Sequence, residues 1–130
     1  MHWGNYTDLL MLLVSSVDRP LLKDIMMECS TSIHHKSYEI EKCWEEIGIQ
    51  LEVDDEELQD IRRRCSPNKN VYSFNYTGAF KDTMRVWIKQ DEPQPTWARF
   101  VEALERLKKF PQFVKHLRSK YCMWTTIDSN

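Results

Sequence analysis

The sequence WEEIGIQLEVDDEELQDIRRRC, at residues 44–65, decides the fold of this chain. Its apolar residues recur at helical spacing on both sides of a short acidic segment. Asp54 is an expected N-cap, because its carboxylate can accept hydrogen bonds from the exposed amides of a first helical turn, and Glu57 holds the reciprocal position of a capping box. Arg62, Arg63 and Arg64 suit the other end of the helix dipole. The stretch therefore predicts two successive helices, the second beginning at Asp54.

On the N-terminal side of this stretch, two apolar faces continue the helical spacing. One contains Ile40, Trp44, Ile47 and Leu51, and the other contains Leu22, Ile25, Met26, Cys29 and Ile33. Serine and threonine at positions 30–32 and 37 are weak helix formers, so residues 21–51 are expected to form either one bent helix or two. Residues 5–16 predict a short helix that ends before Pro20.

On the C-terminal side, three further helical patterns follow residue 76. The first is expected after Gly78, with an inward face of Phe80, Met84, Trp87 and Ile88. The second begins at the N-cap Thr96, and its inward face contains Trp97, Phe100, Val101, Leu104 and Leu107. The third has Pro111 in its first turn, and its apolar face contains Phe113, Val114, Leu117 and Tyr121. Residues 71–76 are aromatic without a clean period, and we expect a short or irregular helix there.

The composition is that of one all-α domain. The chain has 130 residues, of which 42% are hydrophobic, so it can bury a core without metals or disulfides. A formal charge of -2 argues against the broad basic surface that nucleic acid requires. The longest apolar run, at 9–14, is too short to cross a bilayer, and Asp8 rather than a basic region precedes it, which argues against a secretory signal. We therefore expect a cytoplasmic protein with neither membrane nor nucleic-acid partners.

Catalysis and metal binding find little support in the sequence. Four cysteines, at positions 29, 43, 65 and 122, are unclustered, and the first three fall on or beside apolar helical faces. We therefore expect reduced core thiols rather than disulfides. Cys29, His34 and Cys43 lack the paired spacing of a zinc motif, and no nucleophile signature surrounds any cysteine. The chain is accordingly predicted to be no enzyme and to hold no metal or other cofactor.

The order of residues resembles that of a death domain. The quoted features are a tryptophan followed by a glycine and a leucine (Trp44, Gly48, Leu51), the acidic-capped helix after Asp54, the pair Phe80 and Trp87, and the helix opening Thr96-Trp97. This resemblance implies an antiparallel bundle of six helices, which we assign to 21–123. The residues outside it predict a helical extension at 1–20, which departs from the family pattern, and a flexible tail at 124–130. It also implies homotypic association with other death-domain proteins or with itself, in an adaptor that assembles signalling complexes in apoptosis or innate immunity.

Charged residues on the expected helix surfaces are the candidate partner contacts, because opposite charges on one molecule can steer a head-to-tail encounter. The acidic candidates are Asp54, Asp55, Glu56 and Asp60. The basic candidates are Arg62, Arg63, Lys81, Arg85, Lys115 and Arg118. Asp60 can pair with Arg64 across one helical turn, whereas Asp55 and Glu56 are too far from Arg62 and Arg63 to neutralise them. The alternative is a helical DNA-binding module, but its best-capped helix would present an acidic end to phosphate.

Overall fold

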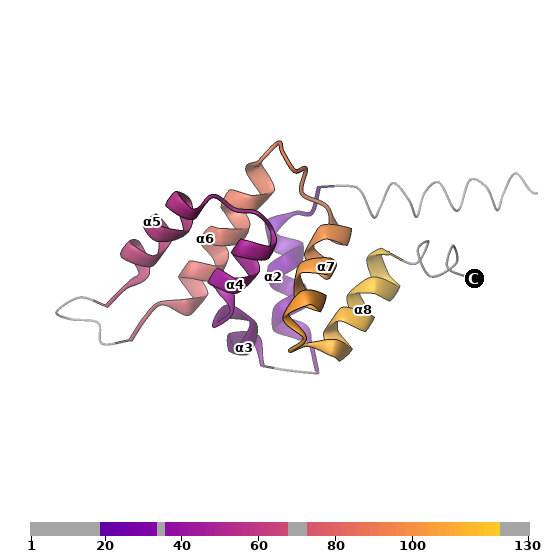
Figure 1. The fold of residues 1–130 in the computed structure, drawn as a ribbon. Helices are drawn as coiled ribbons and strands as arrows, with labels where there is room; N and C mark the ends of the chain where they lie inside the picture. The colour runs from indigo at the N-terminus through magenta and orange to yellow at the C-terminus, as the bar shows by residue number, and fades with distance from the viewer. Residues whose placement is uncertain (1–18, 34–35, 68–72, 123–130) are drawn as a thin grey trace, which may run out of the picture.

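The computed structural model describes residues 19–33, 36–67 and 73–122. The regular elements in these ranges are α2 (Leu22–Thr31), α3 (Ser37–Glu41), α4 (Trp44–Gln50), α5 (Asp55–Cys65), α6 (Tyr76–Lys89), α7 (Trp97–Leu107) and α8 (Pro111–Tyr121) (Figure 1). No strand occurs among the described residues, which confirms the all-α prediction. The predicted helix at 5–16 and the tail at 124–130 lie outside these ranges. None of the described helices combines the length and apolarity needed to span a bilayer.

The core is centred on α6 and α4. Helix α6 contacts α2, α3, α4 and α5, while α4 contacts α5, α6 and α7. The tryptophans Trp44, Trp87 and Trp97 are all buried, as their helical spacing predicted. Phe100 joins two of them across α6 and α7: its ring centroid lies 6.0 Å from that of Trp87 and 5.9 Å from that of Trp97, with the latter pair edge to face. Such aromatic pairs add to the area burial that stabilises the bundle.

Three predicted helix starts are confirmed by their local geometry. The Asp54 carboxylate accepts a hydrogen bond of 2.9 Å from the Glu56 amide at the start of α5. The Thr96 hydroxyl accepts one of 3.1 Å from the Arg99 amide at the start of α7. Pro111 occupies the first turn of α8, where the amide it lacks would have no helical partner.

Gly48 allows α4 to approach α5 and α6 closely. A Cβ atom at this position would lie 2.7 Å from Leu58 Cδ2 and 3.0 Å from Thr83 Cγ2, so a side chain would force these neighbours to move. Thr83 is itself buried, and its hydroxyl donates a 2.7 Å hydrogen bond to the Ala79 carbonyl. The buried polar atom is thus satisfied within α6 while its methyl group packs against α4.

Residues 21–51 form three helices rather than one or two. The first, α2, ends at Thr31, where the hydroxyls of Ser30 and Thr31 donate to the Met27 carbonyl in competition with the backbone. Ile33 therefore lies beyond the helix and is 91% exposed, so its predicted inward position is wrong.

The predicted boundaries around residue 76 also need correction. Helix α6 begins at Tyr76, ahead of Gly78, because the Asn75 side chain accepts a 2.9 Å hydrogen bond from the Gly78 amide and acts as the N-cap. Residues 73–75 are not helical, so the short helix predicted at 71–76 is wrong there; residues 71–72 lie outside the described ranges. Asparagine was the missed signal for this helix start.

Candidate protein-interaction surfaces

The start of α5 presents a compact group of carboxylates, which we call the acidic tip: Asp54, Asp55, Glu56 and Glu57. All four are exposed. Asp54 is occupied as the N-cap, whereas Asp55, Glu56 and Glu57 form no ion pair with any residue that the structure describes. The positive end of the helix dipole stabilises these negative charges although they lie close together. Unpaired exposed carboxylates at a helix start leave the acidic tip available to a cationic surface.

The basic end of α5 is less available than the sequence suggested. Arg62 pairs with Glu45 of α4, and Arg63 pairs with Asp60 one turn earlier. The distance of Asp55 and Glu56 from these arginines suggested that both would be unpaired. They are not, because Glu45 and Asp60 pair with them instead. Asp60 also pairs with Arg63 rather than with Arg64 as predicted.

Asp82 brings basic residues of α5 and α6 together. Its carboxylate lies 2.8 Å from Arg85 Nη1 and 3.5 Å from Arg64 Nη2, so the C-terminal end of α5 and the middle of α6 share one anion. Lys81, on the same helix, has no ion-pair partner within the described ranges and is exposed. Of the basic candidates on these two helices, Lys81 is thus the one with an uncompensated charge.

The remaining basic candidates border a cleft between α7 and α8. This α7/α8 cleft has a volume of about 480 Å³ and an apolar floor that includes Leu104, Phe110 and Val114. Its rim carries Lys108, Lys115 and Arg118. Arg118 donates a 2.7 Å hydrogen bond to Glu105, which lowers the pKa of that carboxyl, while both lysines form no ion pair with described residues.

Lys108 also belongs to this rim, although it is not among the contact residues predicted from the sequence. It ends α7 in the left-handed conformation, with a φ of 57°. This turn precedes Pro111 and directs the chain into α8, so Lys108 and Lys115 border one cleft from two helices. Its position between the end of one helical pattern and Pro111 could have indicated a lysine at the turn between two helices.

The acidic tip and the α7/α8 cleft lie on different parts of the molecule. Helix α5 packs on α4 and α6, whereas α7 packs on α4 and on α8 (Figure 1). The structure therefore separates the predicted residues into two groups on α5 and α6 and a third on α8. A molecule with opposite charges on two separate surfaces can contact a second copy without using the same patch twice.

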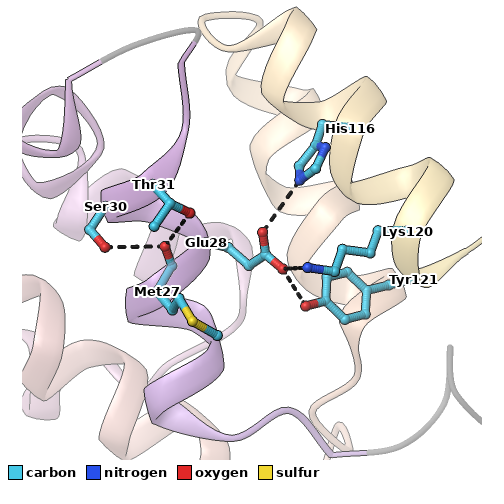
Figure 2. Close-up of polar contacts among 7 residues, drawn as sticks. All are labelled: Met27, Glu28, Ser30, Thr31, His116, Lys120 and Tyr121. Atoms are coloured by element: carbon cyan, nitrogen blue, oxygen red, sulfur yellow. Dashed lines mark hydrogen bonds and ion pairs between the residues drawn. The ribbon is translucent and has the colours of Figure 1, made fainter.

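A buried carboxylate holds α8 in place. Glu28 of α2 is 4% exposed, and its carboxylate accepts hydrogen bonds from the Tyr121 hydroxyl and from Lys120 Nζ at 2.6 Å, with His116 Nε2 at 3.3 Å (Figure 2). Burial raises the pKa of Glu28, but the hydrogen bonds from Lys120, Tyr121 and His116 outweigh it, so the pKa is lowered overall. This Glu28 cluster could not be predicted from the sequence, because a single glutamate beside an apolar face carries no signal of its partner.

The Glu28 cluster also positions Tyr121, whose ring stacks on Trp97 of α7. Burial, followed by the hydrogen bond to the Glu28 carboxylate, raises the pKa of Tyr121, so its hydroxyl remains a donor. The Tyr121 ring stacks on Trp97 with centroids 3.8 Å apart and planes within 5°. Tyr121 thus contacts α2 through its hydroxyl and α7 through its ring. These two contacts help to position α8, which carries Lys115 and Arg118.

The cysteines take no part in these surfaces. All four are buried and none is in a disulfide, as expected for reduced core thiols, and burial raises the pKa of Cys29 to about 12. In the described part of the chain, no group of three or more His, Cys, Asp or Glu residues is placed to hold a metal ion. The described residues thus offer two exposed charged surfaces, the acidic tip and the lysines beside the α7/α8 cleft. Comparison of the chain with protein-family models, with curated proteins and with solved structures gave no match.

Proposed function

We propose that this chain is a non-catalytic protein-interaction module that joins like domains head to tail and so acts as an adaptor in signalling assemblies. The observation that carries the proposal is that the carboxylates of the acidic tip and the lysines Lys108 and Lys115 lie on separate surfaces without ion-pair partners among the described residues. Opposite charges on separate surfaces favour a heterologous contact, which repeats from copy to copy unless a rotation closes the ring.

The α7/α8 cleft offers more than charge to such a partner. Its apolar floor contains Leu104 and Val114, and the basic rim lies around it. Charge then orients the approaching copy and selects the register, while apolar contact inside the rim contributes to affinity. Contacts of this kind are screened by salt, since the Debye length falls to about 8 Å at physiological ionic strength.

The resemblance to death domains supports the same proposal. Trp44 and Trp87 lie in the core of a helical bundle, and Gly48 lies where α4 approaches its neighbours most closely. Homotypic assembly in apoptosis or innate immune signalling is what that resemblance implies for the cellular role, with another death-domain protein or a second copy as the partner.

Sedimentation of the full chain at low and moderate salt tests the proposal. We expect association that weakens as salt rises. The double variant Asp55→Lys/Glu56→Lys should stay monomeric, and so should Lys108→Glu/Lys115→Glu, because each places like charges in contact. Mixing these two variants should restore association, since each reversed patch then meets its complement.

The matched control is Lys89→Glu, which reverses an exposed lysine of α6 outside the α7/α8 cleft. It should associate like the parent. The proposal fails if the parent remains monomeric at low salt and binds no death-domain partner, or if both double variants assemble as the parent does. Unchanged far-UV circular dichroism of each variant shows that the loss of association is not a loss of folding.

A further inference from the structure

A second hollow lies between α2, α3 and α6, and we call it the α2/α6 groove. Its volume is about 820 Å³. Leu22, Met26, Met27 and Phe80 give it an apolar lining, and Met27 is 52% exposed although it is a large apolar side chain. Single exposed apolar residues are ordinary on protein surfaces, but apolar residues that line one hollow indicate a place where another segment packs.

Basic side chains outnumber acidic ones in the lining of the groove. Lys23, Lys81 and Arg85 line it, and neither lysine has an ion-pair partner among the described residues. Arg85 shares Asp82 with Arg64. The opposing charge in the lining is Glu41, which is 7% exposed and lies on α3. A segment that fits this groove should therefore be apolar and acidic.

The chain itself reaches the groove at its α2 end. Arg19 donates hydrogen bonds to the carbonyls of Ile88 and Gln90, the latter at 2.9 Å, just beyond Arg85 at the end of α6. Pro20 is buried, and Leu22 already lines the groove. These contacts hold the chain at the mouth of the groove, directly after residue 18.

The sequence at 1–18 has the composition that the groove requires. It contains the apolar run LLMLLV at 9–14, the two acidic residues Asp8 and Asp18, and no lysine or arginine. Along α2 the groove extends from Leu22 to Ser30, which is about 12 Å at the helical rise. Four residues, at 15–18, can extend about 13 Å, enough for the chain to turn back over the groove.

We propose that residues 1–18 bind in the α2/α6 groove of the same molecule. The apolar run covers Met26 and Met27, and the acidic residues lie near Lys23 and Lys81. Bound in this way, the segment withholds Lys81 and Arg85 from other proteins. The inference does not depend on head-to-tail association, because it uses neither the acidic tip nor the α7/α8 cleft.

Hydrogen exchange of the full chain, read by mass spectrometry, tests the inference. In the parent, amides at 9–14 should exchange at least about tenfold more slowly than an unprotected chain. Met27→Glu places a carboxylate in the apolar lining and should abolish most of that protection. Lys81→Glu should also reduce it, because the reversed charge repels Asp8 and Asp18.

Two variants control for the chemistry of these changes. Ile49→Glu makes the same kind of change as Met27→Glu at a residue that is 57% exposed on α4 and does not line the groove. Lys89→Glu does so for Lys81→Glu on the same helix. Both controls should keep the protection of the parent.

Three results would overturn the inference. The first is exchange at 9–14 in the parent at the unprotected rate. The second is equal protection in the groove variants and their controls. The third is protection that disappears on dilution, because the segment would then occupy the groove of a second copy rather than its own.

Discussion

Replacing Glu28 by alanine removes the acceptor that joins α2 to α8, and the structure gives the size of the expected loss. The Tyr121 hydroxyl loses its partner in a half-buried position, and a hydrogen bond to a charged group contributes about 1.5–3 kcal/mol. The Lys120 side chain is 51% exposed, so solvent screening limits its ion pair to about 1 kcal/mol. We expect Glu28→Ala to lower the free energy of unfolding by about 3 kcal/mol, and the melting temperature by roughly 10 °C.

The assay is chemical denaturation at neutral pH, followed by tryptophan fluorescence. Glu105→Ala is the matched control, since Glu105 also reaches α8, through Arg118, but its side chain is 53% exposed. That exposed pair should contribute less than about 1 kcal/mol. Equal unfolding midpoints for Glu28→Ala and Glu105→Ala would refute the reasoning, because burial of the acceptor would then have no consequence.

The same contact gives stability a defined pH dependence. The pKa of Glu28 is lowered in the folded protein, so its contribution is complete above the ordinary glutamate pKa of about 4.3. As the pH falls through that value toward the lowered pKa, the unfolded chain binds a proton that the folded protein does not, and the contribution is lost. The stability difference between the parent and Glu28→Gln should therefore narrow between pH 7 and pH 3.

Substitutions at three positions test the packing and one helix cap by thermal or chemical unfolding. Gly48→Ala should destabilise by about 1–3 kcal/mol, because the new methyl group meets Leu58 and Thr83 inside normal contact distance; unchanged stability would mean that the helices separate without cost. Trp87→Ala should lose about 3–5 kcal/mol by opening a cavity at a side chain that is 0% exposed, and a melting temperature equal to that of the parent would contradict its core position. Thr96→Ala should cost about 1 kcal/mol through the lost cap of α7, whereas Thr96→Ser should retain most of it.

The features that the sequence predicted well depend on neighbours along the chain. Asp54 and Thr96 cap their helices through amides two or three residues away. Trp87 lies on a periodic apolar face formed by residues of its own helix. Periodicity and capping act within a few turns, so one segment contains the whole signal. The separate helix α3 was missed because five residues are too few to show a period.

The contacts that the sequence did not predict join distant segments. Arg62 finds Glu45, 17 residues away, and Tyr121 finds Glu28, 93 residues away. No local pattern relates such positions, since their meeting depends on how whole helices pack. The acidic tip could therefore be predicted as a charged helix start, but which of the basic candidates remain unpaired could not.

The long span of the Glu28 cluster has a consequence for the order of folding. His116 and Tyr121 are separated from Glu28 by 88 and 93 residues, so these contacts close nearly the whole described chain into one loop. Closing so long a loop carries an unfavourable conformational entropy. The contact therefore forms readily only after the intervening helices have assembled and brought the two ends together. The cluster should then be absent from the folding transition state, and its loss should accelerate unfolding while leaving the rate of folding nearly unchanged. Glu28 should therefore control the lifetime of the folded protein, through the rate of unfolding, rather than the rate of folding.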